Sequence, residues 1–95
     1  MTAAVAGSLD YFVRALAREL GRTRVNVVSP GWVKTPMWDT IAGEGKNALW
    51  DEMASRLPAR RIATPADIAL AYLYLIESEL TTGTTLKVDG GHALI

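Results

Sequence analysis

Apolar residues recur every three or four positions over the first twenty residues, the spacing that gathers them on one side of an α-helix. The recurring positions are Val5, Leu9, Phe12, Val13, Leu16 and Leu20. Gly21 follows the last of them, and glycine commonly ends a helix because it adopts the left-handed conformation at little cost. The pattern therefore predicts a helix over about residues 3–20.

Two short segments rich in β-branched residues are typical of strands. Residues 24–29 read RVNVVS and are followed by Pro30 and Gly31, whereas residues 84–88 read TTLKV and are followed by Asp-Gly-Gly. Glycine and proline interrupt regular structure, so they bound such runs on either side. We expect strands at about 24–29 and 84–88.

The sequence between the two strands predicts two helices. A short helix is expected from Asn47 to Leu57, within a long connection over residues 30–58. A second helix is expected over residues 65–79, because Thr64 can cap it, Pro65 suits its first position and Asp67 stands where a capping-box acid stands. We interpret residues 64–67 as a helix cap without chemistry. This helix is apolar on two faces, one of which carries Leu70, Leu73 and Tyr74.

The order of elements is helix, strand, connection with a short helix, helix, strand. Two consecutive strands joined through a helix are expected to lie parallel, with a right-handed crossover. A sheet of two strands is marginal alone, because its edges are unpaired. The pattern thus predicts an α/β fold in which residues 1–95 form a single partial domain.

Composition excludes several classes of function. Ten basic residues balance ten acidic ones, so the chain lacks the positive charge of a general nucleic-acid binder. It has no cysteine and one histidine, His92, so we expect no metal site. The longest apolar run, Ile68 to Ile76, is far shorter than the ~20 residues that cross a bilayer. Since the first residues also lack the features of a signal peptide, we expect a cytoplasmic protein without a membrane partner.

Several motifs together resemble the C-terminal half of a short-chain dehydrogenase/reductase. They lie in residues 9–20, in 24–35 (RVNVVSPGWVKT), in 61–69 (RIATPADIA), and in two short segments, 82–83 and 88–91. The similarity covers essentially the whole chain, in the order and at the spacing of the family. It implies a doubly wound, Rossmann-like parallel sheet whose last two strands are the strands predicted here.

The resemblance implies a cofactor-facing segment after the first strand. In the family, a Pro-Gly segment at this place lies along the nicotinamide of NAD or NADP. The matching positions are Pro30, Gly31, Val33 and Thr35, with the Val33 backbone facing the carboxamide and the Thr35 hydroxyl facing a cofactor phosphate. Residues 37–57 would cover the substrate. The residues that distinguish NAD from NADP belong to the other half of the fold.

The resemblance also locates the family's catalytic Tyr-x-x-x-Lys pair on the first helix. Residues four apart share a helix face, so the ammonium can lower the phenol pKa from its usual ~10. The two positions correspond to Thr2 and Ala6, and no tyrosine of the chain has a lysine four residues later. The catalytic serine and the Gly-rich turn of the family precede the matched segment. We therefore expect no catalytic residue here, and no binding of NAD(P) by this chain alone.

These observations support three hypotheses about function. The first is an oxidoreductase-family segment that is inactive on its own and self-associates as a homodimer or tetramer. Self-association is expected because the first helix, last helix and last strand form subunit contacts in the family. The second is an interaction or regulatory partner of a full-length dehydrogenase. The third is activity when a separate N-terminal half complements the chain.

Two motifs keep alternative interpretations. The sequence from Gly43 to Ala48 matches the G-x-G-x-x-A form of a dinucleotide fingerprint, but that fingerprint requires a preceding strand, and a hinge before a short helix is favoured. A set of large side chains either lines a substrate pocket or covers a sheet edge. Its members are Met37, Trp38, Trp50 and Met53.

Overall fold

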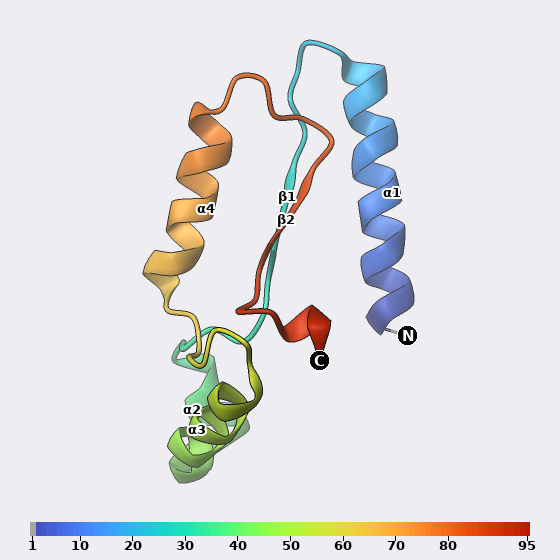
Figure 1. Cartoon of the computed structure of the whole chain (residues 1–95). Coiled ribbons are helices and arrows are strands. Elements are labelled where there is room, and N and C mark those ends of the chain that lie inside the picture. The colour runs from blue at the N-terminus through green and yellow to red at the C-terminus, as the bar shows by residue number, and fades with distance from the viewer. Residues whose placement is uncertain (1) are drawn as a thin grey trace.

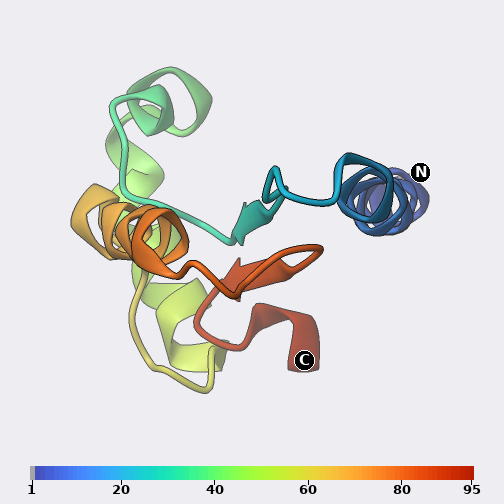
Figure 2. The same ribbon diagram turned by 90° about the horizontal axis from the view of Figure 1, so that it is seen from above.

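Two parallel strands lie between two long helices in the computed structural model, which describes the backbone of residues 2–95 and the side chains from Ser8 onward. Helix α1 (Thr2–Leu20) covers one side of strands β1 (Val27–Pro30) and β2 (Thr85–Val88), and α4 (Pro65–Glu77) covers the other (Figures 1 and 2). Helices α2 (Met37–Ile41) and α3 (Lys46–Arg56) form a lobe below the sheet in Figure 1. The α/β class predicted from the sequence is confirmed.

The strands pair in parallel register, from Val27 opposite Thr85 to Pro30 opposite Val88. The connection between them passes through the lobe and then through α4, as a parallel pair requires. Both strands therefore point their carboxyl ends toward the lobe and toward the start of α4 (Figure 1).

The first strand begins at Val27, three residues later than predicted. Two side chains of residues 24–26 form hydrogen bonds of their own beside the start of the strand. The Arg24 guanidinium donates to the carbonyl of Ile76 at the end of α4 (3.0 Å), and the Asn26 side-chain amide bonds to the loop that precedes β2. One backbone bond continues here, from the Gly83 N–H to the Val25 carbonyl at 2.8 Å, but regular pairing starts only at Val27, so the β-branched pattern overestimated the length of the strand. Helix α4 likewise ends at Glu77 rather than 79, and β2 starts at 85 rather than 84.

The connection over residues 30–58 contains more helix than the sequence predicted. Helix α2 was not expected, because its five residues are too few to show a helical period. Helix α3 runs from Lys46 to Arg56, one residue earlier at each end than predicted. The residues just before Gly43 form α2 and not a strand, which excludes the dinucleotide fingerprint and leaves a short 3₁₀ turn ahead of α3.

The chain is more extended than a compact domain of its length. Its radius of gyration is 15.4 Å, compared with about 12 Å expected for 95 residues. Among the side chains that the structure describes, the buried apolar ones are Val13, Ala17, Leu57, Ile62, Ala71 and Leu75. Many larger apolar side chains are exposed, including Leu70, Leu73 and Tyr74 on the outer face of α4. Over residues 2–95 the structure contains no helix of the length and apolar character needed to span a membrane.

Candidate functional site

The four predicted cofactor-facing residues lie directly after the carboxyl end of β1. Pro30 is the last residue of the strand, and the backbone N–H of Gly31 continues the ladder by donating to the Val88 carbonyl (3.2 Å). A Cβ atom added at Gly31 would lie 2.8 Å from the Cβ of Asp89, closer than real Cβ contacts allow. Glycine is therefore required at position 31 by the close approach of the chain to the end of β2.

Val33 is held from two directions. It forms a parallel bridge with Ala63, in which the Lys34 N–H donates to the Ala63 carbonyl at 2.9 Å. On its other side, the Val33 carbonyl accepts a hydrogen bond from the indole Nε1 of Trp38 at 2.9 Å. The two contacts tie the segment after β1 both to the start of α4 and to the lobe.

Three of the four predicted residues share one hollow. Pro30, Val33 and Thr35 line a depression of about 410 Å³ with the first turns of α4. The remaining lining residues are Pro65, Ile68, Ala69 and Tyr72. Because this lining is mostly apolar, the hollow suits a weakly polar group, and Thr35 and Tyr72 are the lining residues that carry a hydroxyl.

Gly31 opens toward a second and more polar cleft, on the α1 side of the sheet. This cleft has a volume of about 670 Å³ and is also lined by Asp10, Ser29, Thr85 and Lys87, among others. The Asp10 carboxylate accepts a hydrogen bond from the Thr85 hydroxyl (2.6 Å) and joins α1 to β2. Helical spacing placed Asp10 on α1 but could not predict this contact, since its partner is 75 residues away in sequence.

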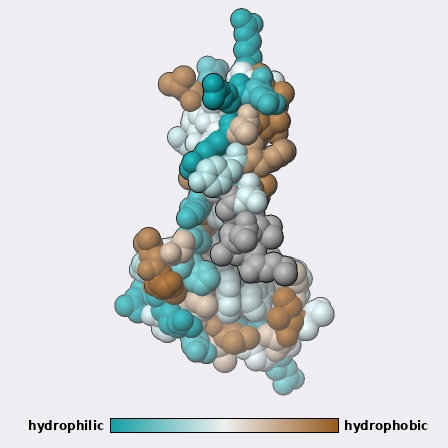
Figure 3. Space-filling view, turned by 90° about the vertical axis from the view of Figure 1, so that its right-hand side faces the viewer, coloured by the Kyte–Doolittle hydropathy of each residue, from teal (hydrophilic) through white to brown (hydrophobic). Residues whose placement is uncertain are grey.

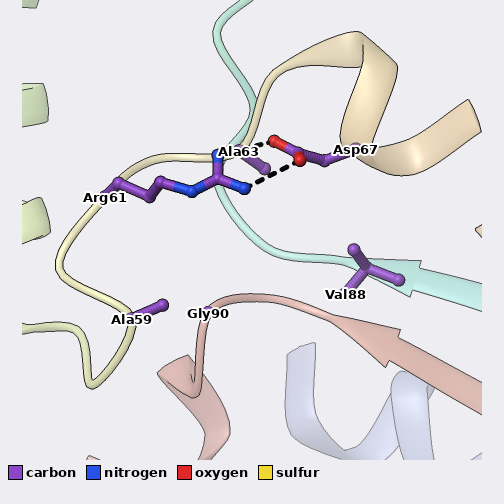
Figure 4. Close-up of a pocket in the computed structure, with 6 residues that line it drawn as sticks. All are labelled: Ala59, Arg61, Ala63, Asp67, Val88 and Gly90. Atoms are coloured by element: carbon purple, nitrogen blue, oxygen red, sulfur yellow. Dashed lines mark hydrogen bonds and ion pairs between the residues drawn. The ribbon is translucent and has the colours of Figure 1, made fainter. Parts of the chain in front are cut away.

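An ion pair holds the start of α4 (Figure 4). Both terminal nitrogens of Arg61 donate to the two Asp67 carboxylate oxygens at 2.8 Å. The same carboxylate accepts the Thr64 backbone N–H at 2.8 Å and the Thr64 hydroxyl at 3.0 Å. Beside the pair lies a cavity of about 160 Å³, bounded on its far side by Val88 and Gly90.

These donors determine the charge state of Asp67. The hydrogen bonds from Arg61, followed by the backbone N–H of Thr64, hold the pKa of the Asp67 carboxyl well below its usual range. The same pairing raises the pKa of Arg61. The sequence predicted the capping contact between Thr64 and Asp67 but not the participation of Arg61.

Three tryptophans pack together where the segment after β1 meets the lobe. The ring centroids of Trp32 and Trp38 are 4.7 Å apart, and those of Trp38 and Trp50 are 6.2 Å apart in an edge-on arrangement. The Lys34 ammonium lies 5.3 Å from the Trp50 centroid. Trp38 and Trp50 thus form the centre of the lobe, whereas Met37 is exposed.

The positions that the resemblance assigns to the catalytic pair lie on the first turns of α1. The side chains of Thr2 and Ala6 are outside the described part of the structure, so their role stays a prediction. Within the described residues, no three histidine, aspartate or glutamate side chains gather as metal ligands.

Comparison with known proteins gives one consistent result. A family model described as Enoyl-(Acyl carrier protein) reductase matches residues 1–93. The chain is 39% identical over 88 residues to the short-chain dehydrogenase/reductase malC of Malbranchea aurantiaca, covering 93% of this chain and 33% of that protein. It is 40% identical over 91 residues to the human 3-oxoacyl-[acyl-carrier-protein] reductase, covering 94% and 35%.

Solved structures agree with the sequence comparison. A small-chain dehydrogenase in complex with NADPH superposes with a TM-score of 0.89 at 35% identity, covering 98% of this chain and 42% of that one. The MalC reductase/Diels-Alderase of Malbranchea aurantiaca superposes with a TM-score of 0.86 at 38% identity, covering 94% and 34%. The chain spans about a third of the length of the curated relatives that it matches.

Proposed function

Because this chain belongs to the short-chain dehydrogenase/reductase family, we propose that it supplies the nicotinamide-facing wall and the substrate-covering lobe of an NAD(P)-dependent oxidoreductase, and that the 95-residue polypeptide does not catalyse the reaction by itself. The wall consists of Pro30, Gly31, Val33 and Thr35. The lobe consists of residues 37–57.

The residues at positions 2 and 6 carry the proposal. Threonine and alanine stand where the family has tyrosine and lysine. An aliphatic hydroxyl cannot replace a phenol as a proton donor near neutral pH, and a methyl group carries no charge with which to lower a neighbour's pKa. Loss of a general acid typically lowers a rate by about 10²–10⁴.

The surroundings of Val33 suggest how the wall would meet a nicotinamide. The Val33 carbonyl is already bonded to Trp38, so its backbone N–H is the group that we assign to the carboxamide oxygen. The apolar hollow fits one face of the ring, and the Thr35 hydroxyl would donate to a cofactor phosphate. When bound, the nicotinamide supplies or accepts the hydride. These contacts form only part of a dinucleotide site, too few to offset the cost of ordering the ligand.

The direct test uses the purified 95-residue chain. NADH or NADPH is titrated while tryptophan fluorescence is followed, beside an assay of dehydrogenase activity on simple alcohols and ketones. We expect neither a saturable fluorescence change nor turnover. Turnover of a carbonyl compound by material free of other polypeptides would show that the proposal is wrong.

A chimera separates cofactor contact from catalysis. The segment replaces the matching part of the small-chain dehydrogenase that has been solved with NADPH. We expect the chimera to bind NADPH without turnover, and the double substitution Thr2→Tyr with Ala6→Lys to restore turnover. Thr2→Phe with Ala6→Lys is the matched control, because it has the ring and the ammonium but no hydroxyl. Full activity of the unsubstituted chimera would contradict the roles assigned to positions 2 and 6.

Self-association is a second candidate property, favoured by exposed apolar side chains. Leu70 and Leu73 on α4 are 66% and 53% exposed, and Phe12 on α1 is 60% exposed. Hydrophobic patches lie beside hydrophilic ones on the face that α1 presents (Figure 3). We expect a homodimer or tetramer in analytical ultracentrifugation, and a shift toward monomer for Leu73→Lys. A well-folded monomer at micromolar concentration would contradict this.

The same faces could instead bind a full-length dehydrogenase and alter its assembly. Mixing the labelled chain with a purified full-length relative distinguishes the two partners. A complex that forms in preference to the self-associated species favours the regulatory hypothesis.

A further inference from the structure

We propose that Arg61 and Asp67 are positioning residues for the nicotinamide-facing segment, acting through Ala63. This inference rests on the proposed function, because that function gives residues 33–35 their role. A helix cap would need only Thr64 and Asp67. Arg61 adds hydrogen bonds to Asp67 from outside the helix. Together with the bond from the Thr64 N–H to Asp67, they enclose Ala63 in a hydrogen-bonded loop.

The geometry of this loop fixes the orientation of one carbonyl group. Asp67 binds Arg61 on one side of Ala63 and Thr64 on the other, so both ends of the short segment are attached to the same carboxylate. The Ala63 carbonyl between them accepts the Lys34 N–H at 2.9 Å, within the bridge to Val33. Figure 4 shows Ala63 directly beside the two paired side chains. The Ala63 carbonyl and the Thr64 N–H belong to one peptide group, so a change at the Asp67 carboxylate reaches Lys34 through that peptide.

The hollow depends on the same attachment. Val33 and Thr35 form one side of it, and the first turns of α4, including Pro65 and Ile68, form the other. The bridge between Val33 and Ala63 joins these two sides next to the hollow. We infer that the ion pair maintains the separation between them, and with it the fit of a planar group.

The ion pair is suited to positioning more than to stability. The Arg61 side chain is 62% exposed, and exposed pairs contribute little to the free energy of folding. A planar guanidinium bound through two parallel hydrogen bonds does, however, restrict orientation in a way that a single contact cannot. Removing it should leave the chain folded while loosening the bridge.

Nuclear magnetic resonance of the 95-residue chain tests this without a cofactor. In Arg61→Gln, which leaves the contact between Asp67 and Thr64 in place, we expect exchange of the Lys34 amide to rise roughly five- to tenfold, as when about one hydrogen bond is lost. The Trp38 indole N–H, which reports the position of the Val33 carbonyl, should shift. The ladder amides of Val27 and Gly31 should not change.

Three further measurements complete the design. Arg61→Lys keeps the charge without the planar fork and should give an intermediate change. Arg56→Gln removes an exposed arginine in the last turn of α3 and should leave Lys34 exchange unaltered. The Trp50 indole N–H, which has no hydrogen-bond partner within the described residues, should shift less than that of Trp38, because only the ring contact links it to the Val33 carbonyl.

Two results would overturn the inference. One is unchanged Lys34 exchange in Arg61→Gln. The other is an effect of Asp67→Asn confined to the first-turn amides of α4, which would make the carboxylate a helix cap only. Both are independent of nucleotide binding, so a chimera that fails to bind NADPH would contradict the proposed function and leave these measurements standing.

Discussion

The two sides of the sheet are built differently. On the α4 side, the segment after β1 is joined to its neighbours by a backbone bridge, an ion pair and an indole hydrogen bond, and it borders an apolar hollow. On the α1 side, Asp10 and Thr85 join helix and strand across a larger polar cleft. The segment after β1 is thus held by more contacts on the α4 side, where we propose the nicotinamide-facing wall, than on the α1 side.

The largest expected effect comes from the packing of α4 on the sheet. Leu75 is buried, and Leu75→Ala should lower the free energy of unfolding by about 2–5 kcal/mol through lost burial and the cavity left behind. Urea denaturation at fixed protein concentration measures this, since self-association would make stability depend on concentration. Leu80→Ala is the control, because Leu80 is 96% exposed and should cost almost nothing. Equal costs at the two positions would show that α4 is not held by this face.

The next effect concerns the end of β1, where the two sides of the sheet meet. Gly31→Ala places a Cβ against Asp89 and should cost about 1–3 kcal/mol of unfolding free energy, as overpacking does. Gly45→Ala is the matched control, because no atom lies within 4 Å of an added Cβ there. If Gly31→Ala were as stable as the control in thermal denaturation, the close approach would be wrong.

A smaller effect is expected on the α1 side. Thr85→Val keeps the shape of the side chain but removes the hydroxyl that donates to Asp10, and should cost about 0.5–1.5 kcal/mol. The effect should disappear in an Asp10→Ala background, which removes the acceptor, so a double-mutant cycle of the two positions isolates the pair. No coupling in the cycle would mean that α1 is held to β2 by apolar contacts alone.

The smallest effect depends on pH. The pKa of Asp67 is lower in the folded chain than the usual value of about 4, so its contribution is present above that value and is lost as the pH falls through the lower folded value. The difference in unfolding free energy between the wild-type chain and Asp67→Asn should be constant from about pH 5 to 8 and shrink in more acidic solution. A difference that grew below pH 4 would contradict the ion pair.

Contacts between distant residues could not be predicted from the sequence. Arg24 falls in the segment predicted as a strand, but its guanidinium bonds to the carbonyl of Ile76 at the end of α4, 52 residues away. Arg61 is only six residues from Asp67, but their pairing depends on how the chain turns into α4, which the capping pattern does not specify. Nothing in the sequence around Asp10 indicates that its carboxylate accepts a hydrogen bond from Thr85. In each case a polar side chain had several possible partners, and local pattern could not choose among them.

The sequence alone determined the helices that begin the chain and precede its last strand, the parallel strands, and the family. These features depend on residue spacing, on capping residues and on short motifs, all of which act over a few positions. Only the tertiary structure decided where β1 starts, why position 31 must be glycine, and which groups orient Val33. Each of these depends on where the second strand and α4 bring their atoms, because a close approach or a hydrogen bond exists only once both partners are in place.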